Sequence, residues 1–85
     1  MKVKVLFFAG LREQLGTSGD EIELPAGVTT VAALRSFLFE KGSAWREALS
    51  ERKLIRMAVN QDMVEAGARI QAGDEIAFFP PVTGG

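Results

Sequence analysis

Residues 73–85 read Gly-Asp-Glu-Ile-Ala-Phe-Phe-Pro-Pro-Val-Thr-Gly-Gly, and this stretch decides the expected fold. Its first half predicts a strand over residues 74–79, because apolar side chains dominate there and turn-forming residues precede it. The two prolines that follow stiffen the chain and keep it extended. The two glycines lack Cβ atoms, so a narrow tunnel can admit them. The stretch therefore predicts a last strand that leads into a stiff, slender tail.

Outward from this strand, hydrophobic periodicity predicts further strands and helices. Strands are expected at residues 2–9, 20–24, 56–60 and 62–66, the last two forming a hairpin that turns near residues 60–62. Helices are expected at residues 11–16 (ending at Gly16), 30–41 (capped by Thr30) and 43–50 (capped by Ser43). We interpret this succession as the order β-β-α-β-β, two hairpins joined by a crossover helix. Such an order predicts an α+β fold with a mixed sheet, one face covered by the helix and the other open.

The open face is expected to carry an apolar patch. Strand 2–9 alternates so that Val3, Val5 and Phe7 point to one face, and Leu6 and Phe8 to the other. If the first and last strands are neighbours, the outward side chains gather into a patch of four residues, Leu6, Phe8, Ala77 and Phe79. Exposed apolar patches usually mark a protein partner. There are two alternatives: the assignment of side chains to the two faces is wrong by one residue, or the short helix at residues 43–50 covers the patch.

Composition excludes many functions. The 85 residues include no cysteine and no histidine, which removes disulfides, Cys or His metal sites and every imidazole-based catalytic triad. No metal site is expected. A net charge of −1 lacks the basic excess of a nucleic-acid binder. No segment is apolar enough for a signal peptide or a membrane span, so we expect a cytoplasmic protein that binds neither membranes nor nucleic acids.

The sequence offers few charged residues that could form a site. No phosphate-binding glycine motif occurs, and the adjacent Asp74 and Glu75 point to opposite faces of a strand. Arg12 follows the first strand and is expected to meet a phosphate or an acidic partner, although a solvated arginine is an equal alternative. The chain has no constellation of side chains that predicts a free-standing enzyme.

The tail is the feature with chemical potential. Residues 80–85 span at most about 20 Å when extended, enough to reach a partner's active site. The terminal carboxylate of Gly85 is ionised at neutral pH and is a poor electrophile until it is converted to a mixed anhydride, for example with AMP. We therefore divide the chain into a domain at residues 1–79 and a tail at residues 80–85. A frayed, inert end is the alternative.

The chain resembles the family of molybdopterin synthase small subunits, which are ubiquitin-like β-grasp sulfur carriers. The resemblance is carried by residues 5–9 (Val-Leu-Phe-Phe-Ala) with Arg12 and Glu13, by residues 58–60 (Ala-Val-Asn) and, most specifically, by residues 73–85. It implies that an adenylating enzyme uses ATP to form an acyl-adenylate on Gly85, and that a sulfur donor then displaces AMP to leave a thiocarboxylate. Sulfur would pass to cyclic pyranopterin monophosphate, without any permanently bound cofactor.

The resemblance also implies partners. The tail, formed by Pro80, Pro81, Val82, Thr83, Gly84 and Gly85, would enter the large subunit of a heterotetramer, which supplies the catalytic residues. The open sheet face would dock this subunit and the adenylating enzyme in turn. Three alternatives stay open: a thiazole-pathway sulfur carrier, a ubiquitin-like modifier that forms isopeptide bonds, and an interaction domain with an inert tail.

Overall fold

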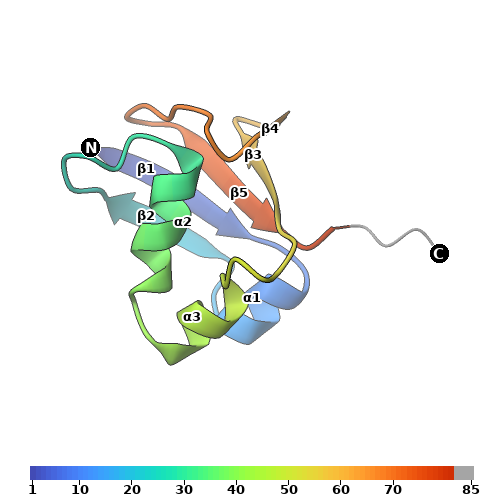
Figure 1. Ribbon diagram of the computed structural model, residues 1–85. Coiled ribbons are helices and arrows are strands. Elements are labelled where there is room, and N and C mark those ends of the chain that lie inside the picture. The colour runs from blue at the N-terminus through green and yellow to red at the C-terminus, as the bar shows by residue number, and fades with distance from the viewer. Residues whose placement is uncertain (82–85) are drawn as a thin grey trace.

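The first strand, β1 (Lys2–Phe7), lies inside the sheet with a neighbour on each side. A computed structural model describes residues 1–81 and gives the strand order β2-β1-β5-β3-β4. β1 is antiparallel to β2 (Gly19–Glu23) and parallel to β5 (Glu75–Phe79), as Figure 1 shows. β5 is antiparallel to β3 (Arg56–Val59), and β3 forms a hairpin with β4 (Asp62–Val64). The expected α+β fold with a mixed sheet is confirmed.

The helices are α1 (Gly10–Leu15), α2 (Val31–Phe39) and α3 (Ser43–Ala48). The expected order β-β-α-β-β is too simple, because β5 belongs to neither hairpin and inserts between β1 and β3. Parallel neighbours need a long crossover connection, which here contains α2 and α3. No helix within residues 1–81 is long and apolar enough to cross a membrane.

The core lies between the sheet and the helices. Val3, Val5 and Phe7 of β1 are buried, as the alternation predicts. They face an apolar stripe of α2 formed by Val31, Leu34 and Leu38, each fully buried. α3 packs on the same side of the sheet, because the Trp45 ring lies 5.5 Å from the Phe7 ring in an edge-on arrangement. The alternative that α3 covers the outer apolar residues is therefore wrong.

The predicted helix ends are partly correct. The Oγ1 of Thr30 accepts a hydrogen bond from the Ala33 N–H at 3.1 Å, and Gly16 ends α1 in the left-handed conformation, as expected. The cap of α3 is Gly42 and not Ser43. The reason is that the Gly42 carbonyl already accepts the first helical hydrogen bond, from the Arg46 N–H at 2.9 Å, so Ser43 lies inside the first turn.

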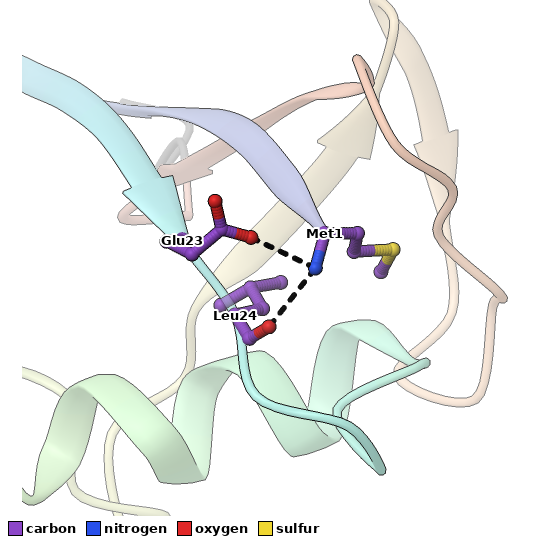
Figure 2. Close-up of polar contacts among 3 residues, drawn as sticks. All are labelled: Met1, Glu23 and Leu24. Carbon is purple, nitrogen blue, oxygen red and sulfur yellow. Dashed lines mark hydrogen bonds and ion pairs between the residues drawn. The ribbon is translucent and has the colours of Figure 1, made fainter.

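The start of β1 is fixed to the end of β2. The Met1 amino group donates to the Leu24 carbonyl at 3.0 Å and lies 3.0 Å from the Glu23 carboxylate (Figure 2). The Leu24 N–H donates in return to the Met1 carbonyl at 2.7 Å. These contacts fix the end of the sheet at which β1 begins. β1 and β5 both finish at the opposite end.

A side-chain clasp fixes the start of β5 against the β3–β4 turn. Asn60 and Gln61 form the predicted turn with φ of 50° and 72°, the backbone of a two-residue type I′ hairpin. The Asn60 side chain accepts from the Glu75 N–H at 3.0 Å and donates to the Asp74 carboxylate at 3.0 Å. Asp74 also closes the turn before β5, where its N–H donates to the Gln71 carbonyl and its carboxylate accepts from the Gln71 N–H, and β5 begins at Glu75, one residue later than predicted.

Arg35 of α2 ties the segment after α3 to the helix layer. Its guanidinium donates to the carbonyls of Leu49 (3.0 Å), Ser50 (2.6 Å) and Lys53 (3.0 Å). Burial lowers the pKa of Arg35, and the nearby Glu51 carboxylate raises it in partial compensation. One side chain thus satisfies three carbonyls of the segment that leads into β3.

We expect Arg35→Met to lower the free energy of unfolding by about 2 kcal/mol, because the three carbonyls lose a charged donor. Arg46→Met is the matched control, since Arg46 forms an ion pair whose two side chains are 57% and 65% exposed. Its cost is expected to stay below about 1 kcal/mol. Urea unfolding of both variants checks this, and equal losses would contradict the assigned role of Arg35.

Gly19 begins β2 where the strand passes Leu6, and it has room for no side chain. A Cβ atom there would lie 2.2 Å from the Val5 carbonyl oxygen and 3.0 Å from the Leu6 Cα, and its φ is 144°. The sheet at this point therefore requires glycine.

Gly19→Ala is expected to destabilise the fold by about 1–3 kcal/mol, because β2 must move away from β1. Gly67→Ala is the control, since a Cβ at Gly67 meets nothing within 4 Å. Thermal unfolding followed by circular dichroism measures both, and a neutral Gly19→Ala variant would show that the pairing of β2 with β1 is looser than described.

Candidate functional site

The two faces of the sheet differ in what covers them. α2 and α3 pack on one face (Figure 1), where the side chains of Val3, Val5 and Phe7 are buried. The alternate residues of β1 point to the other face, and Phe8, which follows the strand, is 44% exposed. The open face is therefore the part of the sheet available to another molecule.

The four predicted patch residues come together on this face. The parallel register places Leu6 opposite Ala77. One step further along, the rings of Phe8 and Phe79 lie 6.4 Å apart in an edge-on arrangement. The predicted phase is therefore confirmed, and the pairing of β1 with β5 that the patch requires is present.

Two residues that the sequence analysis missed extend this patch. Ala58 of β3 lies opposite Ala77, although only 5% of its surface is exposed, and Met63 of β4 lies opposite Ala58 with 51% of its surface exposed. The signal for them was the alternation within residues 56–60 and 62–66, which becomes informative only once the strand order is known. We define the outer patch as six residues, Leu6, Phe8, Ala58, Met63, Ala77 and Phe79.

Charged residues border the outer patch on the side where β1 begins. Lys4 lies between Glu21 of β2 and Glu75 of β5 in the cross-strand register. Such alternating neighbours balance their charges across the sheet. Arg12 lies apart from this arrangement: it is an exposed residue of α1, whose side chain has no ion pair within residues 1–81. The structure does not assemble Arg12 with the patch.

The tail leaves the sheet beside the outer patch. Because β1 and β5 are parallel, both strands end at one edge, where Phe8 and Phe79 lie. Pro80 and Pro81 follow, both half-buried, and proline cannot donate to the sheet ladder, so β5 ends there. The predicted tail residues Val82, Thr83, Gly84 and Gly85 lie outside the described residues.

The described residues supply an apolar surface that another molecule can cover, and they offer no cluster of metal-ligating side chains. Within residues 1–81 no three His, Cys, Asp or Glu side chains gather closely enough to hold a metal ion. The outer patch can exclude water against an apolar partner, and the tail that starts at its edge can reach beyond it. The arrangement is suited to a chain that another protein acts upon.

Comparisons with known proteins agree with this geometry. The ThiS family matches residues 5–85. The chain is 48% identical to the molybdopterin synthase sulfur carrier subunit of Escherichia coli K12 and 46% identical to that of Haemophilus influenzae, in each case over 98% of this chain and 99% of the relative.

Solved structures show the same fold. SAMP1 from Haloferax volcanii superimposes with a TM-score of 0.76 at 28% identity over 100% of both chains. A complex of subunits 1 and 2 of the molybdopterin-converting factor from Helicobacter pylori contains a similar chain, with a TM-score of 0.67 and 28% identity over 100% of both chains. The fold is the ubiquitin-like β-grasp, and the chain belongs to the ThiS family, with relatives that are molybdopterin synthase sulfur carrier subunits.

Proposed function

We propose that this chain carries sulfur on Gly85 for the synthesis of molybdopterin. The observation that carries the proposal is the parallel pairing of β1 with β5, which places the outer patch and the start of the tail at one edge of the sheet. Its relatives are sulfur carrier subunits, non-catalytic partners within molybdopterin synthase. A docked partner would therefore receive the tail directly.

The tail chemistry proceeds by two displacements and one transfer. The Gly85 carboxylate attacks the α-phosphate of ATP, releasing pyrophosphate and leaving an acyl-adenylate. A sulfur donor then displaces AMP, leaving a thiocarboxylate. That sulfur passes to cyclic pyranopterin monophosphate, and water restores the carboxylate. ATP is used by the partner enzyme, and the chain itself holds no permanent cofactor. Because it has no cysteine, its sulfur must come from outside.

The proposal includes two protein partners in turn. One is the large subunit, which receives the tail in a heterotetramer of two large and two small subunits. The other is an adenylating enzyme similar to ubiquitin-activating enzymes. Both would dock on the outer patch, and so they exclude each other. We place these reactions in the cytoplasm, where ATP is available.

A ubiquitin-like modifier is the second candidate, because the chain superimposes on SAMP1, a small archaeal modifier protein. In that function Gly85 would end in an isopeptide bond to a lysine. High-mass conjugates in cell extract, detected with an antibody to the chain, would favour the modifier, and their absence would favour the carrier. A thiazole-pathway carrier would use the same tail with a different acceptor.

Incubation with the adenylating enzyme, ATP and a sulfur source is expected to raise the intact mass by the exchange of one oxygen for one sulfur. The gain should map to Gly85, because the proposed adenylation takes place on its terminal carboxylate. A variant that lacks Gly85 and a variant with one alanine added after it are the controls, and both are expected to show no gain. Sulfur on an extended, unclipped tail would contradict the proposal.

Phe8→Asp is expected to weaken binding to the large subunit about tenfold or more, because it places a charge within an apolar interface. The fold should survive, since Phe8 is 44% exposed. Ala32→Asp, on the exposed side of α2, is the control and should bind like the unmodified chain. Isothermal titration calorimetry measures each affinity, and equal affinities for all three would refute docking through the outer patch.

A further inference from the structure

We infer that Arg56 gives the outer patch a charge requirement, so that the protein which covers the patch must place a carboxylate against this guanidinium. The inference rests on the proposed docking of the large subunit through the patch. It adds to that proposal the chemistry of the partner surface and the orientation in which the two proteins meet.

Arg56 belongs to the open face. It lies opposite Phe79 in the β3–β5 register, while its neighbour Met57 is 8% exposed and faces the core. Arg56 itself is exposed. Arg56 therefore lies on the outer face of β3, two residues before Ala58 in the chain. Across the sheet it lies beside Phe79, the last aromatic residue before the tail.

Arg56 also borders a groove next to the patch. The groove has a volume of about 470 Å³ and is lined by Ile55, Arg56, Met57, Met63, Val64, Glu65 and Ala66. Met63 belongs to both the groove and the outer patch, so the two surfaces are continuous. Because β3 lies between β5 and β4, a partner that spans Phe79 of β5 and Met63 of β4 also covers this end of β3, where Arg56 lies.

The described part of the chain does not neutralise Arg56. Within residues 1–81 the ion pairs are Met1 with Glu23 and Arg46 with Glu40. Arg35, by comparison, donates to three carbonyls. In the free protein water solvates Arg56, but an interface would remove that water, and a buried charge without a partner is strongly unfavourable. The docked partner must supply the counter-charge.

Within residues 1–81, Glu65 is the one acidic residue that lines the groove beside Arg56 and so could serve as its counter-charge. Glu65 makes no ion pair with Arg56. The chain has already left the sheet at Glu65, because β4 ends at Val64 and the Glu65 carbonyl accepts from the Ala68 N–H in a turn. Of the acids of the open face, Glu21 and Glu75 lie beside Lys4, and Glu23 lies beside Lys2 and pairs with the Met1 amino group. Arg56 is therefore the unbalanced charge at the tail end of the face.

This asymmetry has a consequence for docking. An apolar patch alone permits several orientations of the partner, because hydrophobic contact is non-directional. A single carboxylate matched to Arg56 fixes one orientation, as complementary charges do at interfaces. Because Arg56 pairs with Phe79, the fixed point lies next to the start of the tail, where orientation decides whether the tail enters the partner's active site.

The test measures affinity for the large molybdopterin synthase subunit of the same organism, by isothermal titration calorimetry at low and high salt. Arg56→Gln is expected to weaken binding about tenfold and Arg56→Glu about a hundredfold, because the latter adds repulsion to the lost pair. The control is Arg69→Glu, an equal charge change at an exposed residue whose backbone pairs with Thr30 on the far side of the fold. It should change affinity by no more than about twofold.

The salt dependence of binding should fall in Arg56→Gln, and a partner variant with one acidic residue changed to lysine should restore the binding of Arg56→Glu. Thermal unfolding confirms that each variant folds. If Arg56→Glu binds like Arg69→Glu while Phe8→Asp is impaired, this inference is wrong and the docking surface stands. If Phe8→Asp is also unimpaired, the docking surface itself is wrong. If Glu65→Gln weakens binding as much as Arg56→Gln, the counter-charge comes from Glu65 and the inference is overturned.

Discussion

The parallel pairing of β1 with β5 is the constraint on which the rest of the structure depends. It places a strand from the start of the chain beside one from its end, so that both strands finish at the same edge of the sheet. One set of their side chains builds the core with α2, and the other set builds the outer patch. The tail then leaves from the edge where Phe8 and Phe79 meet. The core, the outer patch and the exit of the tail follow from one register.

Backbone hydrogen bonds join the starts of the two strands, from the Lys4 N–H to the Asp74 carbonyl and from the Gly73 N–H to the Lys2 carbonyl, and further contacts secure this same end of the sheet. Asn60 and Asp74 clasp the start of β5 to the β3–β4 turn, and the Met1 amino group holds the start of β1 against β2. Neither clasp contacts the outer patch. The fold is thus secured at one end of these strands and leaves the other end free, an arrangement suited to the proposed docking and release of the chain.

Much of this could be predicted from sequence because alternation reports the phase of a strand directly. Val5 and Leu6 point to opposite faces whatever their neighbours are, and Thr30 and Gly16 carry local signals for helix ends. The contributions of Ala58, Met63 and Arg56 could not be predicted, because they depend on which strands pair. The cap of α3 was wrong by one residue, since both Gly42 and Ser43 are acceptable caps and only the backbone hydrogen bond distinguishes them.

The most direct measurement is a nuclear magnetic resonance titration of the isotopically labelled chain with the large subunit. The account predicts that resonances of the outer patch, from Leu6 and Phe8 to Ala77 and Phe79, shift or broaden together with those of Arg56, while those of Ala32 and other exposed residues of α2 stay unchanged. Perturbations centred on α2 and α3, with the open sheet face unaffected, would contradict it.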